Sequence, residues 1–211
     1  MNTLNKKRVI FYIDGFSLYY GVKEAFGKTY KWLDLHKLAC IFCAPDEEIE
    51  QINYFTSIVK RDVPKQQRQR TYIKAIKTLP KLRDHYGKYS PEHIYFNNGI
   101  CTHVINRWRE KMTDVNISVK MITDAFDNKF DVIKLITGDK DLKAPILEIK
   151  KRFPEKRIIV IFPPGRFRHP KDIGKICDEC IGIKLKHVKQ CLLPDQIHTT
   201  KGIISKPLEW Y

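Results

Sequence analysis

The sequence predicts a three-layer α/β/α fold, in which helices cover both faces of a central and mostly parallel β-sheet. Fully apolar segments that end at turn residues carry this prediction, and residues 9–13, followed by Asp14 and Gly15, form the first of them. Such segments are typical of strands buried on both faces, as in the middle of a parallel sheet. Helical patterns separate these segments, and this alternation favours a parallel sheet.

The first half of the chain alternates between the two element types. A helix is expected from near residue 17 to Gly27, where glycine ends it, and a second helix or helical turn over 32–42. Residues 49–59 are mainly apolar and aromatic and are predicted to form the second strand. Residues 66–79 repeat apolar residues near helical spacing, which predicts a helix. Residues 81–90 are predicted to form a basic loop with tyrosines.

The middle of the chain predicts a short strand over 93–96 and a turn at 97–99, followed by a long helix. Thr113 is the expected N-cap of this helix, with Asp114 in its first turn. Apolar residues then recur at i, i+4, i+7 and i+11, which predicts a core-facing stripe. The stripe consists of Val115, Val119, Ile122 and Phe126.

The last third of the chain continues the alternation and then loses it. The expected elements are a strand over 131–137, a helix over 143–153, a strand over 158–162, a short helix over 173–180 and an edge strand over 181–185. Pro145 is tolerated because it falls in the first turn of its helix. Residues 193–211 are expected to form a tail that packs on, or extends from, a domain of residues 1–192.

Length and composition fit one globular α/β domain, since the chain has 211 residues, of which 43% are apolar. No apolar run approaches the roughly 20 residues that a membrane span needs. The N-terminal residues run directly into the first strand, without room for the apolar core of a signal peptide. We therefore expect a cytoplasmic protein without membrane association.

The net charge of +15 indicates a negatively charged partner. Between residues 60 and 88 the chain has ten lysines and arginines against two acidic residues. A solvated helix face would explain this run, but a basic patch together with a carboxylate cluster favours contact with nucleic acid. The predicted substrate-binding residues on the helix at 66–79 are Arg68, Arg70, Lys74 and Lys77.

Two pairs of cysteines have the C-x-x-C spacing: Cys40 with Cys43, and Cys177 with Cys180. The spacing is compatible with zinc, but the gap between the pairs is far longer than in common zinc ribbons or fingers. Cys40 and Cys43 also fall in an apolar helical pattern, where cysteine is a small buried hydrophobe. We favour this second interpretation, and zinc binding stays open. A disulfide framework is not expected in a cytosolic chain.

Carboxylates follow two of the predicted central strands. Asp14 ends the first strand, and Asp139 and Asp141 follow the strand at 131–137. If both strands are central and parallel, these side chains meet at the carboxyl edge of the sheet, where open α/β sheets bind ligands. Carboxylates that close repel one another unless a cation lies among them. The pattern therefore predicts a site for a hard divalent cation.

Three segments carry a resemblance to a known family. They are Tyr-Ile-Asp-Gly-Phe-Ser-Leu-Tyr-Tyr at 12–20, Glu-Lys-Met-Thr-Asp-Val-Asn at 110–116 and Leu-Ile-Thr-Gly-Asp-Lys-Asp-Leu at 135–142. In this order they resemble the NYN domain family, the branch of PIN-like nucleases that also includes the LabA-type proteins. The resemblance runs from about residue 8 to residue 163, and the segment at 193–210 is similar to the tail of bacterial members.

The resemblance implies a PIN-like fold, a bound Mg²⁺ or Mn²⁺ and the hydrolysis of RNA, with RNA or another nucleic acid as the partner; a homo-oligomer is compatible with it. The implied metal-binding and catalytic residues are Asp14, Asp114, Asp139 and Asp141. Many members have Asn where this chain has Ser17, a substrate-binding candidate whose hydroxyl can bond a carboxylate or phosphate. A bound cation lowers the pKa of its water and offsets charge at phosphorus, so no His or Cys nucleophile is required.

Each acidic residue also has a structural interpretation. Asp14 can cap a turn, Asp139 and Asp141 can form an Asx turn into the next helix, and Asp114 can stabilise the start of a helix. Glu110 and Asp124 are weaker candidates, expected around the site or at the surface.

Two other functions fit parts of the pattern. A phosphatase of the haloacid dehalogenase type also places an Asp after its first strand, but its chemistry needs a second Asp two residues later, where this chain has Phe16. A regulatory module of the same fold would bind RNA without cutting it, because all the acids can be present in a site that never assembles. Metal-dependent cleavage of RNA separates this module from a nuclease.

Overall fold

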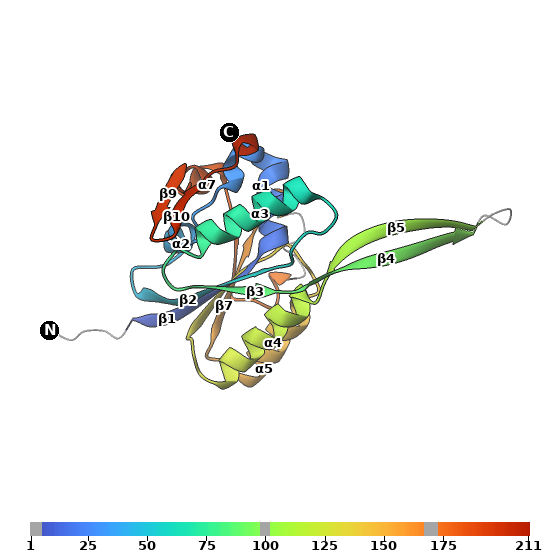
Figure 1. The fold of residues 1–211 in the computed structure, drawn as a ribbon. Helices are drawn as coiled ribbons and strands as arrows, with labels where there is room; N and C mark the ends of the chain where they lie inside the picture. The colour runs from blue at the N-terminus through green and yellow to red at the C-terminus, as the bar shows by residue number, and fades with distance from the viewer. Residues whose placement is uncertain (1–5, 98–101, 167–172) are drawn as a thin grey trace.

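The computed structural model describes residues 6–97, 102–166 and 173–211, with the backbone alone for 93–97 and 102–107. A six-stranded sheet forms its centre, and each strand runs parallel to its neighbours in the order β3-β2-β1-β6-β7-β8 (Figure 1). The strands are β1 (Lys7–Asp14), β2 (Glu47–Thr56), β3 (Leu82–Tyr86), β6 (Val132–Ile136), β7 (Arg157–Phe162) and β8 (Glu179–Gly182). The predicted α/β class with a parallel central sheet is confirmed.

Strand β1 lies inside the sheet, paired with β2 on one side and β6 on the other. Its alternate residues enter two separate hydrophobic cores. Val9, Phe11 and Ile13 belong to one core, and Ile10 and Tyr12 belong to the other. All five side chains are buried. A strand buried on both faces has no polar alternation, which explains the continuous apolar run in the sequence.

Helices cover both faces of the sheet (Figure 1). One face packs against α1 (Gly15–Phe26), α2 (Leu35–Ile41), α3 (Val63–Ile76), α7 (Leu185–Gln190) and the 3-10 helices η1 (Lys28–Lys31) and η2 (Leu208–Trp210). The other face packs against α4 (Thr113–Phe126) and α5 (Lys143–Arg152). The predicted strands at 49–59 and 158–162 and the predicted helices at 66–79 and 143–153 agree with these bounds to within three residues. Within the described residues, no helix combines the length and apolar character that crossing a membrane requires.

A long antiparallel hairpin projects from the body of the domain (Figure 1). It consists of β4 (Lys88–Asn97) and β5 (Thr102–Lys111), whose pairing begins with Lys88 opposite Lys111. We call this hairpin the β4–β5 arm. It forms a two-stranded sheet of its own, separate from the central sheet.

The loop predicted at 81–90 is wrong. Leu82–Tyr86 forms the edge strand β3, which pairs in parallel with β2, and residues 88–90 already belong to the arm. The strand predicted at 93–96 lies inside β4, and most of the turn predicted at 97–99 lies outside the described residues. Strand β5 has no counterpart among the predicted elements.

The core-facing stripe predicted for α4 is also wrong at three of its four positions; the fourth, Ile122, is partly buried and packs against the core. Val115, Val119 and Phe126 are 58%, 59% and 58% exposed. The face of α4 that packs on the sheet is rotated relative to this stripe. Its fully buried apolar residues are Ile117, Met121 and Ala125.

The C-terminal residues return to the body of the domain. After α7 they form a small hairpin of β9 (Gln196–Thr199) and β10 (Gly202–Ser205), then η2. Trp210 in η2 is 2% exposed, and its ring centroid lies 6.0 Å from those of Trp32 and Tyr72. Just before this region, residues 174–178 of the short helix predicted at 173–180 form turns and bends, and residues 179–180 already belong to β8, which overlaps the edge strand predicted at 181–185.

The two cysteine pairs lie on opposite faces of the central sheet. Cys43 packs against the core that contains α2, whereas Cys177 and Cys180 pack against the core that contains α4. The four thiols therefore cannot form one zinc site. Cys40 is exposed, so the buried role predicted for it is wrong, and Cys43 is only partly buried.

Candidate functional site

The candidate site lies at the carboxyl ends of β1 and β6, which are neighbours in the middle of the sheet. The chain leaves β1 into α1 on one face, while α5 follows β6 on the other face. Connections that diverge in this way open a crevice above the strand ends, the usual ligand position in an open parallel sheet. Asp14 ends β1, and Asp139 and Asp141 follow β6, so the topology brings the predicted carboxylates to this crevice.

Asp14 is held in place by two hydrogen bonds. Its Oδ1 accepts from the backbone N of Ser17 at 3.0 Å and so caps α1, and its Oδ2 accepts from the Thr137 hydroxyl at 3.2 Å. Gly15 is required beside it, since a Cβ there would lie 2.6 Å from both the Phe55 carbonyl oxygen and the Tyr54 ring. Asp14 as a whole residue is 6% exposed, so its carboxylate is held in place where the strand meets the helix.

The loop after β6 is tied to the start of α1. The Gly138 backbone N donates to Ser17 Oγ at 2.8 Å, and the Asp139 backbone N donates to Thr137 Oγ1 at 3.0 Å. Asp139 Oδ1 in turn accepts from the Asp141 backbone N at 2.9 Å, which forms an Asx turn. The structural interpretations of Asp14 and Asp139 thus hold locally, and each oxygen keeps a second lone pair for another partner.

Two more acids come from the junction between the β4–β5 arm and α4. Glu110 lies at the end of β5, and Asp114 is the second residue of α4. Met112 between them has a φ of 75° and acts as the N-cap, so the chain turns sharply there. Thr113, predicted as the N-cap, is instead the first helical residue, and its hydroxyl donates to Glu110 Oε1.

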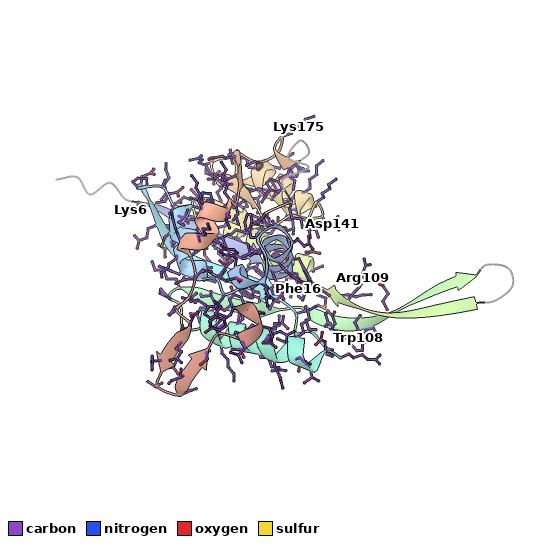
Figure 2. All side chains as sticks on the ribbon, turned by 90° about the horizontal axis from the view of Figure 1, so that it is seen from above. Lys6, Phe16, Trp108, Arg109, Asp141 and Lys175 are labelled. Carbon is purple, nitrogen blue, oxygen red and sulfur yellow. The ribbon has the colours of Figure 1, made fainter. Side chains whose placement is uncertain are left out.

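The acids from these segments line one open cleft with a volume of about 690 Å³. We define the acid cleft by Asp14, Ser17, Glu110, Asp114, Asp139 and Asp141. Its wall also includes basic and aromatic side chains. These are Arg109, Lys111, Lys140, Arg166, Phe16 and Tyr20. Figure 2 shows Phe16, Arg109 and Asp141 at the end of the body from which the arm projects.

The carboxyl groups in the acid cleft repel one another. Burial, together with the charges of Asp114 and Asp139, raises the pKa of Asp14 to about 6. Burial, with the charges of Asp14 and Asp114, raises the pKa of Glu110 to about 7. The pKa of Asp114 is also raised, by burial and then by Asp139 and Asp141. Negative charge in this cleft is therefore unfavourable unless a cation or a proton offsets it.

The acid cleft has the donor chemistry that a hard divalent cation requires. Its carboxylates and hydroxyl supply oxygen ligands, which Mg²⁺ and Mn²⁺ prefer. In the part of the chain that the structure describes, none of these carboxylates forms an ion pair with a basic side chain. Nor, across the same residues, are three His, Cys, Asp or Glu side chains grouped closely enough to hold a metal ion as they stand.

The basic residues predicted on α3 do not line the acid cleft. Arg68 forms an ion pair with Glu209 at 2.8 Å, and Lys77 forms one with Asp84 at 2.8 Å. Lys74 lines a separate groove between α3 and the β9–β10 hairpin, and Arg70 is exposed. Their role in binding substrate stays a prediction.

Asp124 does not belong to the acid cleft. Its side chain is 0% exposed on the buried face of α4, where it accepts from the Tyr12 hydroxyl at 2.7 Å and from Lys120 Nζ at 2.6 Å. These partners compensate its charge, so its role is structural.

Sequence reasoning underestimated Glu110 and missed the basic wall of the cleft. The underestimate of Glu110 and the omission of Arg109 and Lys111 follow from the missed strand β5, because these three residues enter the cleft together at its end. The signal available in the sequence was the charged run before Asp114, which includes the Glu-Lys pair of the second motif.

Comparisons with known proteins agree with this geometry. The NYN domain family model matches residues 8–184. A crystal structure of a protein of unknown function from Vibrio parahaemolyticus is similar in fold, with a TM-score of 0.53 and 18% sequence identity over 92% of this chain and 100% of that chain. A search of curated proteins finds no match. Since the matched residues cover most of the sequence, including both strands and all four predicted acids of the cleft, the chain belongs to the NYN domain family.

Proposed function

We propose that the protein is a metal-dependent ribonuclease that hydrolyses RNA phosphodiester bonds in the acid cleft. The observation that carries this proposal is the meeting of five carboxyl groups from three separate segments in one cleft of a chain with a net charge of +15; within the described residues, none of the five forms an ion pair. Membership of the NYN family supports it, because this family belongs to a nuclease-like superfamily. The assignment to the LabA-type branch stays a prediction.

In this proposal Asp14, Asp114, Asp139 and Asp141 hold Mg²⁺ or Mn²⁺. The cation, when bound, lowers the pKa of a water molecule and offsets negative charge at phosphorus. Asp14 and Asp139 are already oriented by their backbone contacts, so the ordering of these two side chains precedes binding.

Other residues of the cleft act on the substrate directly. Arg109, Lys111 and Arg166 lie on the wall and can bind the phosphate oxygens on either side of the scissile bond. Glu110 lines the same cleft, where its carboxylate can accept a proton from the attacking water. Ser17 accepts a hydrogen bond from the Gly138 backbone N and so orients the loop that carries Asp139 and Asp141.

The test is cleavage of labelled RNA with added Mg²⁺ or Mn²⁺ and with chelator. We expect cleavage only with the metal, and a loss of at least about 100-fold in the Asp114→Asn variant, since substitutions that merely support metal ligands already reduce activity 10- to 100-fold. Asp127→Asn is the matched control, because Asp127 lies at the other end of α4 and pairs with Lys129 at 2.7 Å. Cleavage that persists in chelator would remove the metal mechanism.

The same experiment addresses a non-catalytic RNA-binding module. That interpretation is favoured by the turn bonds that already engage Asp14 and Asp139, and by carboxylates that, among the described residues, are not grouped around one point. RNA that binds to the wild-type protein but is not cut under any metal condition would support it.

A further inference from the structure

A second surface lies at the root of the β4–β5 arm, beside the acid cleft. The rings of Tyr89 and Trp108 stack there, with centroids 6.0 Å apart and planes inclined by 15°. Two cations from the turn before α3 lie over Trp108: the Arg61 guanidinium at 5.0 Å and Lys60 Nζ at 5.8 Å from the ring centroid. We call these four residues the arm platform.

The arm platform is continuous with the acid cleft. In the arm, Tyr89 pairs with Glu110, and Pro91 pairs with Trp108. Paired residues share a face of an antiparallel ribbon, as do residues two apart on one strand, so Tyr89, Trp108 and Glu110 share one face. Trp108 is two positions from Glu110, a separation of about 7 Å along the strand. Figure 2 shows Trp108 and Arg109 at the root of the arm, next to the body that carries Phe16 and Asp141.

The cations of the arm platform are available to a ligand. Lys60 and Arg61 are exposed, and among the described residues neither forms an ion pair with a carboxylate. Lys65, one turn later, connects the platform to the cleft wall, where its Nζ donates to the Tyr20 hydroxyl at 2.9 Å. Tyr20 stacks on Phe16 with centroids 6.0 Å apart, which places a second aromatic pair on the cleft itself.

We propose that the arm platform binds a single strand of nucleic acid outside the acid cleft, with nucleobases stacked on the Tyr89–Trp108 pair and phosphates bound by Lys60 and Arg61. Aromatic rings interleaved with cations are the features by which proteins hold single strands without reading their sequence. A duplex hides the faces of its bases and gains nothing from the rings. The inference rests on the proposed function in one respect: it assumes that the bound nucleic acid continues into the acid cleft.

Tryptophan fluorescence tests this proposal directly. The chain has three tryptophans; Trp32 and Trp210 are 0% and 2% exposed, whereas Trp108 is partly exposed. We expect a single-stranded RNA of about 12 nucleotides, within the site sizes usual for single-strand binding, to quench the emission of the full-length wild-type protein in chelator. The Trp108→Phe variant should keep its fold and lose this quenching. Equal quenching in the variant would overturn the proposal.

Affinity measurements supply the second arm of the test. In chelator, Trp108→Ala and Arg61→Ala should each weaken binding of the same single strand about tenfold, which corresponds to about 1.4 kcal/mol. The matched controls are Phe126→Ala and Arg152→Ala, because the Arg152 guanidinium lies 5.7 Å from the ring of exposed Phe126 at the far end of α4. Unchanged affinity in both platform variants, or an equal loss for a blunt duplex, would overturn stacking. Binding is measured in chelator, where we expect no cleavage. The affinities therefore test the arm platform even if the protein proves not to be a nuclease.

Discussion

Asp139 combines a structural bond with a charge, and one substitution separates the two. Asn keeps an oxygen that can accept from the Asp141 backbone N, but it removes a charge that raises the pKa of Asp14 and Asp114. We expect Asp139→Asn to melt in chelator at or above the wild-type temperature, because repulsion is relieved. Wild type should gain stability with Mn²⁺ by mass action, and the variant should gain much less.

Melting curves of both proteins, with and without Mn²⁺, check this expectation. Asp178→Asn is the contrasting control, because Asp178 accepts from the Ile158 backbone N at 2.7 Å and pairs with Lys150 at 2.9 Å. It should melt lower than wild type whether or not Mn²⁺ is present. If Asp139→Asn behaves like this control, Asp139 belongs to the turn and not to a metal site.

Asp14 should make the metal-free protein less stable as pH rises. Its pKa is raised from 3.8 to about 6 in the folded state, so the folded state binds this proton more tightly than the unfolded state. The associated stability is fully present below pH ~4 and is lost as pH rises through about 6, a loss on the order of 3 kcal/mol. Urea unfolding of wild type and Asp14→Asn between these pH values, in chelator, should show a steeper loss in wild type. Parallel pH profiles would contradict the raised pKa.

At the scale of single elements, α4 shows how a sequence pattern misleads. Both of its faces carry apolar residues at helical spacing, and the buried face also includes Asp124, which a sequence pattern assigns to solvent. Tyr12 and Lys120 satisfy that carboxylate, so the helix buries it with Met121 and leaves Val119 exposed. Only the contact with Tyr12 on β1 reveals which face of the helix is buried.

Shortening a side chain should have different effects on stability on the two faces of α4. Met121→Ala should lower the free energy of unfolding by about 2–5 kcal/mol, because it empties part of the core, whereas Val119→Ala should change it by no more than about 0.5 kcal/mol. Denaturant unfolding of the two variants measures the difference. Comparable losses of unfolding free energy in both variants would support the stripe predicted from the sequence.

The same reasoning explains which elements could be predicted. Strands β1, β6 and β7 are buried on both faces, so their apolar runs identify them, and with them the positions of Asp14, Asp139 and Asp141. None of the described side chains of the β4–β5 arm belongs to either core, so no burial pattern marks them in the sequence. Arg109 and Lys111 of the cleft wall were missed with it, and Glu110 was ranked only as a weaker candidate.

At the scale of the whole molecule, charge is divided between a basic exterior and the acid cleft. For single strands, a variant that binds one phosphate fewer should show a slope of log affinity against log salt that is lower by about 0.7. We expect this decrease for Arg109→Ala, whose side chain lines the cleft, and the same measurement on Lys74→Ala, in the groove beside β10, tests the phosphate binding predicted for α3. Titrations of RNA at several salt concentrations measure the slope for each variant. A lower slope for the Lys74 variant would support the phosphate binding predicted for α3.

The β4–β5 arm also implies uneven local stability along its length. Its backbone hydrogen bonds are made within the ribbon, and it projects from the body, whose cores lie elsewhere (Figure 1). A two-stranded ribbon is marginally stable by itself, so amide hydrogens in the arm should exchange through local opening, far below the free energy of global unfolding. Protection should be greatest at the root, near Gly87, where a Cβ would meet Thr113 Oγ1 at 2.6 Å, and should decrease outward. The order of the arm should therefore depend on its contacts, including those with a bound strand.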